Sequence, residues 1–345
     1  MRFILSNYVQ PILLKTNEGS CNCSTFTENG KRYLISRNVT YYLVQNQSYI
    51  IDGKYHTKNF LYELLNDYSL KPIKELETIT GNNDCIYFGL EDIRTVKWNN
   101  SNYFLCTKVH GNTDDGTMCL GEIKNCSLTN IKEIKTTNRR EKNWAPIEVE
   151  PFNAIYSNHP GKKIDLKDAS FYDLPNNEKV SGSTPLVKYD NYNLAIVHTK
   201  DENFTYYHYF VLYDKNYTIV KKSEAFSFFG NKTEFCCELK CNNDNIEIFM
   251  SVNDGISYVF NLSKSLVKDI LENNLDNNTF NDSVYDKFFE DAVKIHAWNV
   301  AAVQALAVHA KDNLELGIQI NHEKASLNPQ DKAKIQKQLL GKYYL

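Results

Sequence analysis

A strand–turn–strand pattern recurs along this chain and constrains its fold more than any other feature of the sequence. Four copies begin at Asp92, Lys142, Gly182 and Thr233. Each has a polar entry, an alternating strand, a tight turn and a second apolar strand that ends in polar residues. Alternating strands joined by turns rich in Asn or Asp are typical of β-hairpins. A fifth and weaker copy begins at Asn38.

The spacing of these hairpins predicts a repeat architecture. Their turns fall near residues 46, 100, 152, 192 and 244. The intervals, roughly 40 to 54 residues, match those of four-stranded propeller blades, whereas a β-sandwich needs no such period. The segment from Tyr207 to Ser223 forms a further hairpin around Lys215-Asn216 and supplies outer strands. We therefore predict an all-β fold, a five-bladed β-propeller over residues 1–265.

The composition changes after Asn261. From Ser283 to Ala310 the apolar residues fall at helical spacing. A further helix is predicted from the N-cap Asn328 to Gly341, where a glycine ends it. We predict a C-terminal α-helical extension over residues 266–345. We expect it to pack on the propeller's flank, with homo-oligomerisation through these helices as the alternative.

Bulk properties exclude several partners and groups. A net charge of −3 and a pI near 6.3 give no field that would attract nucleic acid or an anionic membrane. The longest apolar stretch, around residues 300–308, is too short to span a bilayer. Polar residues interrupt the apolar N-terminus, so we expect no signal peptide and a cytoplasmic protein. The nine cysteines lack paired C-x-x-C spacing, which favours reduced thiols over a metal site.

The propeller prediction gathers polar side chains from four repeats. The innermost strands of a propeller line its centre, so the start of each first strand shares a rim with the end of each second strand. The residues at these positions are Glu91, Asp92, Arg94, Lys142, Asn143, Ser183, Thr184, His198, Glu234, Asn253 and Asp254. Trp98, Trp144, Tyr87 and Tyr258 are available as aromatic walls. Any one of these polar residues could be a solvated turn residue, but their recurrence in register favours a sugar-binding cavity.

Six short motifs resemble those of glycoside hydrolase family 130. They are EDIR at Glu91, KNWAP at Lys142, GSTP at Gly182, LAIVH at Leu194, TEF at Thr233 and SVND at Ser251. Their order and separations carry the resemblance, which covers residues 85–260. The family comprises five-bladed propellers that act as β-mannoside phosphorylases, with β-1,2-mannosyltransferases on the same fold.

The resemblance implies a role for each matched residue. Asp92 is implied as the proton-transfer residue. Phosphate or a phosphorylated donor would be bound by Arg94, Lys142 and His198. Sugar hydroxyls would be bound by Glu91, Asn143, Trp144, Ser183, Thr184, Glu234 and Asp254. Two departures stand out: Ile93 replaces the family's usual Pro, and no second Arg is found at a strand mouth, since Arg139 and Arg140 are out of register.

The sparse phosphate site decides the function expected from the sequence. We predict an inverting glycosyltransferase that moves a mannose-like hexose from a nucleotide-sugar or sugar-phosphate donor to a saccharide acceptor, with no cofactor. Asp92 would act as general base on the acceptor hydroxyl, while Arg94, Lys142 and His198 stabilise the departing phosphate. Two alternatives remain. One is a phosphorylase or hydrolase of β-mannosides with Asp92 as general acid. The other is a non-catalytic propeller that binds sugar or protein.

Overall fold

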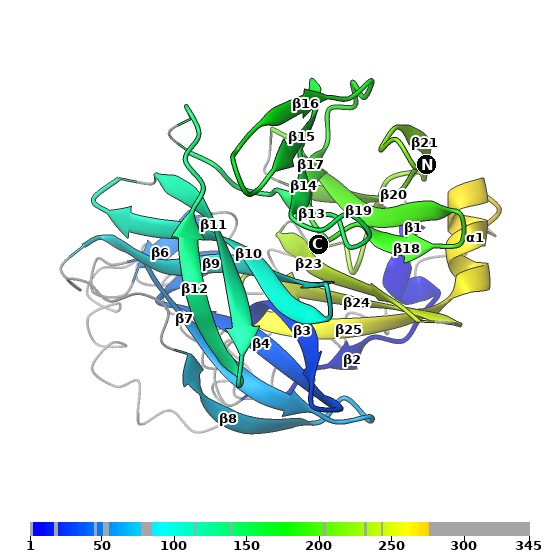
Figure 1. Cartoon of the computed structure of the whole chain (residues 1–345). Helices are drawn as coiled ribbons and strands as arrows, with labels where there is room; N and C mark the ends of the chain where they lie inside the picture. Colours follow the sequence, from blue (N-terminus) through cyan, green and yellow to red (C-terminus); the bar gives the residue numbers. More distant parts are fainter. Residues whose placement is uncertain are drawn as a thin grey trace.

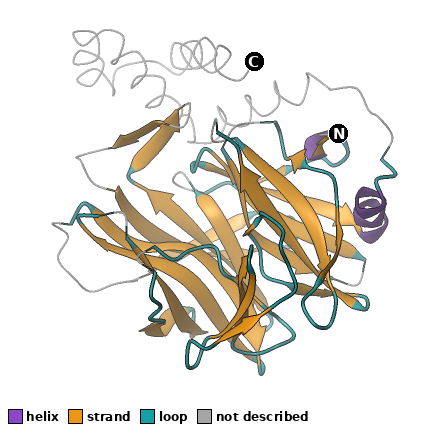
Figure 2. Cartoon of the chain, turned by 90° about the horizontal axis from the view of Figure 1, so that it is seen from above, coloured by secondary structure: helices purple, strands orange, loops and turns teal. Residues whose placement is uncertain are grey.

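The computed structural model describes residues 3–16, 20–44, 47–50, 55–76, 85–113, 115–138, 140–202, 205–230, 233–242 and 244–275. Over these residues the chain is mainly β, with a single α-helix, and several sheets stand side by side (Figures 1 and 2). The predicted all-β class is therefore confirmed for this part of the chain. The helices predicted for residues 283–310 and 328–341 lie outside it. None of the described helices is both long and apolar enough to span a membrane.

The strands gather into antiparallel groups that follow one another along the chain. The first two groups lie in one eight-stranded sheet, in the order β12-β11-β10-β9-β7-β4-β3 with β8 beside β7. Their strands are β3 (Cys21–Glu28), β4 (Lys31–Val39), β7 (Tyr55–Leu64), β8 (Leu70–Leu76), β9 (Tyr87–Trp98), β10 (Ser101–Gly111), β11 (Gly116–Lys124) and β12 (Ser127–Glu133). A short parallel pairing of β7 with β9 joins the two groups.

Three further sheets follow in sequence order. The third group is the sheet of β13 (Ala145–Pro146), β14 (Asn153–Asn158), β15 (Gly161–Asp165) and β16 (Phe171–Asp173). The next sheet has β17 (Ser181–Gly182), β18 (Val187–Tyr189), β19 (Tyr192–Lys200), β20 (Tyr206–Tyr213), β21 (Ile219–Lys222), β22 (Phe226–Ser227) and β1 (Phe3–Ile4). The last has β23 (Glu234–Cys241), β24 (Asn245–Val252), β25 (Ile256–Ser263) and β2 (Ile12–Leu13).

Strands from the two ends of the described chain pair with each other. N-terminal β2 adds to β25, and N-terminal β1 runs parallel to β22. The 3-10 helix η1 (Leu5–Asn7) lies between β1 and β2. Because these pairings fasten the first residues to the last sheets, they close the arrangement of groups without a covalent link.

Hydrogen bonds hold the first strands of different groups together. Thr95 Oγ1 on β9 lies 2.6 Å from the carbonyl oxygen of Thr25 on β3 and 2.9 Å from Glu238 Oε2 on β23. Strands β3, β9 and β23 therefore meet, and β13 also contacts β9. Polar groups carried at the ends of these strands are brought within reach of one another.

The predicted hairpins are present, but the first group was placed incorrectly from the sequence. Hairpins β9–β10 and β23–β24 pair as expected, as do β20 and β21. The copy from Asn38 forms only the separate pair β5 (Tyr41–Val44) and β6 (Gln47–Ile50). The first group instead turns at Asn29-Gly30, where both residues have positive φ (51° and 76°). An Asn-Gly pair suits such a turn, and this local signal marks the hairpin of the first group.

The helix α1 (Lys264–Glu272) covers one flank of the sheets. Ser263 Oγ caps its N-terminus by accepting the Leu266 N–H at 3.2 Å. Val267, Ile270 and Leu271 are buried in the same apolar cluster as residues of β19, β20, β24 and β25. The start of the predicted extension thus packs against the sheets.

Candidate active site

A β-bulge on β9 carries the predicted proton-transfer residue. Glu91 pairs with Thr107 and Arg94 with Leu105, so that Asp92 and Ile93 together face one residue of β10. Asp92 has φ 53°, a left-handed conformation that Asp and Asn adopt more readily than other non-glycine residues. Ile93 is 1% exposed and packs in the core. The extra residue changes the direction of the Asp92 side chain while Ile93 anchors the strand.

A second bulge on the neighbouring strand β3 places Asn22 beside Asp92. Cys21 pairs with Arg37 and Ser24 with Ile35, which leaves an extra residue on β3. Asn22 has φ 49°, close to the value at Asp92. Its Nδ2 donates to Asp92 Oδ1 at 2.6 Å. The two bulged strands thus meet through a hydrogen bond between their irregular residues.

Arg37, near the end of β4, joins the two acids at the bulge of β9. Its Nη1 donates to Asp92 Oδ1 at 3.0 Å and its Nη2 to Glu91 Oε1 at 2.7 Å. Its Nε donates to Thr57 Oγ1 at 3.1 Å. The sequence reading found no second arginine at a strand mouth, and Arg37 corrects it. Arg37 lies two residues before the end of β4, as His198 does in β19, so the same rule applied to the correct first group would have found it.

Tyr41 extends this network to the last sheet. Its hydroxyl donates to Asp254 Oδ2 at 2.9 Å and accepts from Arg37 Nη2 at 3.3 Å. Asp254 sits in the β24–β25 hairpin loop with φ 48°. We call the connected residues Asn22, Arg37, Tyr41, Glu91, Asp92 and Asp254 the acid cluster. It unites side chains from three of the strand groups and β5.

The acids of this cluster can be reached from solvent. The side chain of Glu91 is 28% exposed and that of Asp92 14% exposed, whereas Arg37 is 5% exposed. Arg37 is therefore a buried positive charge beside carboxylates that are partly open to solvent.

Burial and neighbouring charges separate the pKa values of the three acids. At Asp92 burial raises the pKa, but Arg37, Arg94, the bond from Asn22 and Lys142 outweigh it and hold the pKa below its usual range. Burial prevails at Glu91 over the attraction of Arg37, and the nearby negative charge of Asp92 adds to it, so the pKa of Glu91 is raised. Burial also raises the pKa of Asp254 despite Arg37 and Tyr41. Groups of one type whose pKa values are driven apart are a recurring feature of acid–base sites.

Arg94 supports the backbone of Asp92, and Asn143 in turn bonds to Arg94. Arg94 is fully buried and donates through Nε to the Ser183 carbonyl at 2.6 Å, and through Nη1 to the Asp92 carbonyl at 3.2 Å. Its Nη2 donates to Asn143 Oδ1 at 3.2 Å. The sequence expectation was an arginine that binds phosphate. The structure instead shows its guanidinium bonded to three protein groups around the Asp92 backbone.

Several predicted sugar-binding residues are also buried. We call Ser183, Thr184, His198, His208 and Glu234 the buried polar layer. Ser183 Oγ lies 2.7 Å from His198 Nδ1, and Thr184 Oγ1 accepts the Ile196 N–H at 2.9 Å. The carboxylate of Glu234 accepts the Phe228 and Phe229 N–H groups at 2.6 and 2.9 Å. Ser183, Thr184 and Glu234 are 0% exposed, which differs from the expectation that they face a sugar.

The predicted aromatic walls are mostly core residues. Trp144 is 0% exposed and donates through Nε1 to Glu141 Oε2 at 3.1 Å, while Trp98 and Tyr258 are each 1% exposed. Tyr87 differs from them, because it is only half-buried. It stacks on Tyr55 with ring centroids 5.0 Å apart, and Tyr55 lies 5.4 Å from Tyr41 of the acid cluster. These tyrosines, not the tryptophans, are the aromatic groups beside the acids.

The charges of Lys142 and Arg140 act on Lys200, and that of Lys142 also acts on Asp92. Lys142 is exposed, and its charge acts on Glu91, Asp92, Asp254 and His198 alike. Burial, together with Lys142 and Arg140, lowers the pKa of Lys200. Three cations that disfavour one another's charge form a surface suited to an anion.

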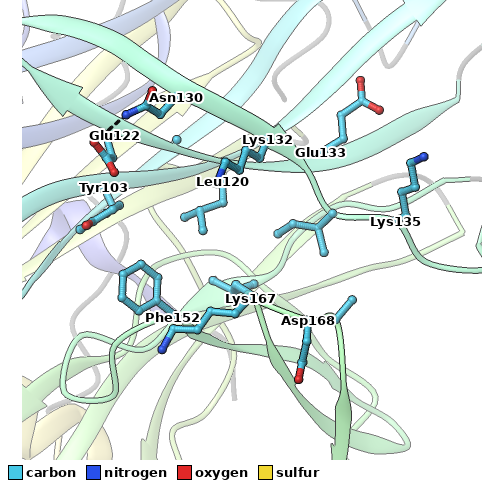
Figure 3. Close-up of a pocket in the computed structure, with 14 residues that line it drawn as sticks. Tyr103, Leu120, Glu122, Asn130, Lys132, Glu133, Lys135, Phe152, Lys167 and Asp168 are labelled. Carbon is cyan, nitrogen blue, oxygen red and sulfur yellow. Dashed lines mark hydrogen bonds between the residues drawn. The ribbon is translucent and has the colours of Figure 1, made fainter.

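A groove of about 790 Å³ lies elsewhere on the molecule, between β10–β12 and the loop after β15 (Figure 3). Its walls include Tyr103, Leu120 and Phe152, with charged residues at the rim. None of its lining residues belongs to the acid cluster or the buried polar layer. The groove is therefore separate from the candidate active site.

The fold is that of solved carbohydrate-active enzymes. One is the β-1,2-mannobiose phosphorylase from Listeria innocua, with a TM-score of 0.56, 13% identity, and coverage of 74% of this chain and 92% of that one. Another is a glycosyl hydrolase from Bacteroides ovatus (TM-score 0.55, 10% identity, 76% and 94% covered). A third represents the mannoside phosphorylases of glycoside hydrolase family 130, which include hydrolases that target β-1,2-mannosidic linkages in Candida mannan (TM-score 0.53, 11% identity, 73% and 86% covered). No protein-family model and no curated protein matches the sequence. The chain has a fold of the family 130 type, as its motifs predicted.

Proposed function

We propose that this protein is an inverting phosphorylase of β-mannosides, built as a five-bladed propeller in which each strand group is one blade. The single observation that carries the proposal is the Arg37 clamp, which holds Glu91 and Asp92 together at the meeting point of the first strands. The fold shared with a mannobiose phosphorylase and family 130 enzymes supports cleavage over the transfer reaction that the sequence suggested.

Asp92 is the proposed proton-transfer group in this reaction. A phosphate oxygen attacks the anomeric carbon from the face opposite the departing oxygen, the glycosidic C–O bond breaks, and mannose 1-phosphate forms with inverted configuration. The departing oxygen takes the proton of the Asp92 carboxyl, directly or through a sugar hydroxyl, and Asp92 regains a proton from solvent. In the reverse direction the ionised carboxylate accepts the proton of the attacking hydroxyl.

The cations beside Asp92 favour phosphate as the attacking group. The charge of Lys142 acts on Asp92, and Lys142 and Lys200 both act on buried His198. Burial above all, with His208, Arg94 and Lys142, holds the pKa of His198 well below its usual range, so its ring is neutral at pH 7 and would contribute as a hydrogen-bonding group. Phosphate binding would offset the cations that keep Asp92 ionised and would thereby favour its protonated form.

The remaining acids are proposed to hold the sugar. Glu91 and Asp254 lie on either side of Arg37, which binds Glu91 directly and Asp254 through Tyr41. Carboxyl groups in such a network can accept or donate hydrogen bonds to sugar hydroxyls. Tyr55 and Tyr87 would offer ring surface to the apolar face of a sugar.

The test is cleavage of β-1,2-mannobiose with and without inorganic phosphate, followed by detection of mannose and mannose 1-phosphate. We expect phosphate-dependent release of both products, and a roughly 10²- to 10⁴-fold loss in Asp92→Asn, the range of general acid catalysis. Asp190→Asn is the matched control, because Asp190 has φ 50° in a turn and is largely exposed. Cleavage without phosphate would identify a hydrolase. No cleavage of any β-mannoside by the wild type, with sugar binding retained, would identify a non-catalytic module.

A further inference from the structure

Two bulges bring Asn22 and Asp92 together, although 69 residues separate them in the chain. Each bulge adds one residue to its strand and thereby shifts the alternation of side chains between the two faces. Both have left-handed backbone conformations, with φ 49° and 53°. Asn22 is 4% exposed, so its contact with Asp92 is shielded from solvent. A polar contact between two bulged residues, one of them buried, is a built feature of the site.

The protein's hydrogen bonds to the Asp92 carboxylate converge on one oxygen. Asn22 Nδ2 lies 2.6 Å from Oδ1, and Arg37 Nη1 lies 3.0 Å from the same atom. Among the described residues no donor reaches Oδ2. Two donors on Oδ1 fix the rotation of the carboxyl plane and leave Oδ2 as the oxygen that can exchange a proton with a substrate.

Ser251 on β24 fixes the orientation of the Asn22 amide. Its Oγ donates to Asn22 Oδ1 at 2.8 Å, and it is 1% exposed. A rotated amide would direct its oxygen at the Asp92 carboxylate, where two acceptors repel, and would leave the serine hydroxyl facing an N–H group. The Ser251–Asn22 pair therefore presents a donor, and only a donor, to Asp92.

Arg37 alone would not fix Asp92 in this way. Its guanidinium also serves Glu91, Tyr41 and Thr57, so its position reflects four partners. Asn22 serves Asp92 and Ser251, which makes it the more specific support.

We propose that Asn22, oriented by Ser251, is a positioning residue that sets the rotation and the protonation of the Asp92 carboxyl. The inference rests on the proposed function for its kinetic consequence, but the effect of Asn22 on Asp92 itself does not depend on which reaction is catalysed. Each can therefore fail without the other.

The experiment replaces Asn22 with glycine and with aspartate. Asn22→Gly removes the amide and keeps the left-handed backbone accessible, which alanine would not. Asn22→Asp substitutes a carboxylate, whose charge repels that of Asp92. Ser251→Ala tests the orientation of the amide. Asn102→Ala is the control, since Asn102 Nδ2 donates at 2.9 Å to the Thr27 carbonyl of the same strand β3, away from Asp92. Thermal unfolding confirms that each variant is folded.

Two readouts separate positioning from general structural damage. The first is the pKa of the Asp92 carboxyl, measured by carbon-13 NMR of aspartate-labelled protein with Asp92→Asn for assignment. The second is the pH profile of kcat/KM for phosphorolysis, together with kcat and KM at one pH. Asn22→Gly should raise the pKa of Asp92, because a hydrogen bond to the charged form is lost, and Asn22→Asp should raise it further.

In cleavage the protonated form of Asp92 is the active one, so its alkaline limb in kcat/KM should move to higher pH in the same order. Loss of orientation should lower kcat about 10- to 100-fold with little change in KM. Ser251→Ala should follow in the same direction with smaller effects, and Asn102→Ala should change none of these quantities. An unchanged pKa of Asp92 in both Asn22 variants would overturn the inference. If the wild type cleaves no mannoside, the proposed function fails, and the pKa comparison still decides the role of Asn22.

Discussion

Both the acid cluster and the buried polar layer contain polar residues that the sequence places near strand ends. The two sets differ in exposure and in hydrogen-bond partners. In the acid cluster Glu91 and Asp92 retain 28% and 14% of their side-chain exposure. In the buried polar layer Thr184 and Glu234 have none, and their polar atoms bond to backbone N–H groups.

This difference in exposure and hydrogen bonding separates the proposed reacting group, Asp92, from carboxylates that support the fold. The Glu234 carboxylate accepts two backbone N–H groups and is fully buried, so it stabilises a loop and is shielded from a ligand. A carboxylate held through one oxygen over a buried arginine keeps the other oxygen for chemistry. The position of a carboxylate at a strand end does not predict whether it is open to a ligand or bonded into the protein. That depends on the hydrogen-bond partners that other strands supply.

Apart from loss of the Asp92 carboxyl itself, the largest effect is expected from Arg37→Lys in the acid cluster. Lysine keeps the charge but cannot donate in parallel to Glu91 and Asp92. We expect phosphorolysis to fall about 100-fold, as for a misplaced catalytic group, and the free energy of unfolding to fall by about 1.5 to 3 kcal/mol, as for a lost hydrogen bond to a charged group. Urea unfolding and initial rates measure the two losses.

The matched control for this variant is Arg32→Lys. Arg32 lies on the same strand β4 and forks onto Glu247 with distances of 3.2 and 2.8 Å, away from the acids. It should lose little activity. Equal activity losses in the two variants would mean that Arg37 has no special relation to the site.

A smaller effect, on stability alone, is expected from Glu234→Gln in the buried polar layer. Glutamine has one acceptor oxygen, so one of the Phe228 and Phe229 N–H groups would lose its partner. We expect the free energy of unfolding to fall by about 1 to 3 kcal/mol, the cost of an unsatisfied buried donor. KM for mannoside and phosphate should not change. The exposed ion pair of Glu178 with Lys222 offers the control Glu178→Gln, which should change neither quantity. A raised KM in Glu234→Gln would return Glu234 to the sugar-binding set.

At neutral pH the smallest effect comes from the histidine of the same layer, which makes stability depend on pH. Burial lowers the pKa of His208 to about 3, against roughly 6.5 in an unfolded chain. Between these values the unfolded chain binds a proton that the folded protein does not, so stability falls as pH drops. The slope from His208 is about 1.4 kcal/mol per pH unit.

Replacement of this ring by phenylalanine isolates the slope. His208 packs against Phe226 and Phe228, with centroids 5.8 and 4.9 Å away, so His208→Phe suits its surroundings. Urea unfolding at pH 4.5, 5.5 and 7 should show the difference between wild type and variant shrinking or reversing towards acid pH. Parallel curves would contradict a neutral, buried His208.

Much of the fold could be predicted from the sequence, because hairpins are encoded locally. Asn99-Asn100 turns between β9 and β10 with φ 49° and 63°, values that favour asparagine, and alternation on either side sets which faces are buried. The first group was predicted incorrectly because the spacing of the repeats pointed to a hairpin near residue 46, whereas its turn lies at Asn29-Gly30. The candidate acids were also found, although Glu91 and Asp92, expected before the strand, lie at a bulge within β9, and Asp254 lies in a hairpin loop.

The sequence by itself determined the β-hairpins, the family-type motifs and the identity of the acids on β9. Only the tertiary structure decided what surrounds those acids, because Asn22, Arg37 and Tyr41 come from the first group and from β5, at sequence separations that no local pattern reports. It also decided that Trp144, Thr184 and Glu234 are buried, since burial depends on how neighbouring sheets pack. The direction of each pKa shift follows from this placement. The carboxyl pKa is raised at Glu91, where burial prevails, and lowered at Asp92, where cationic and amide partners prevail.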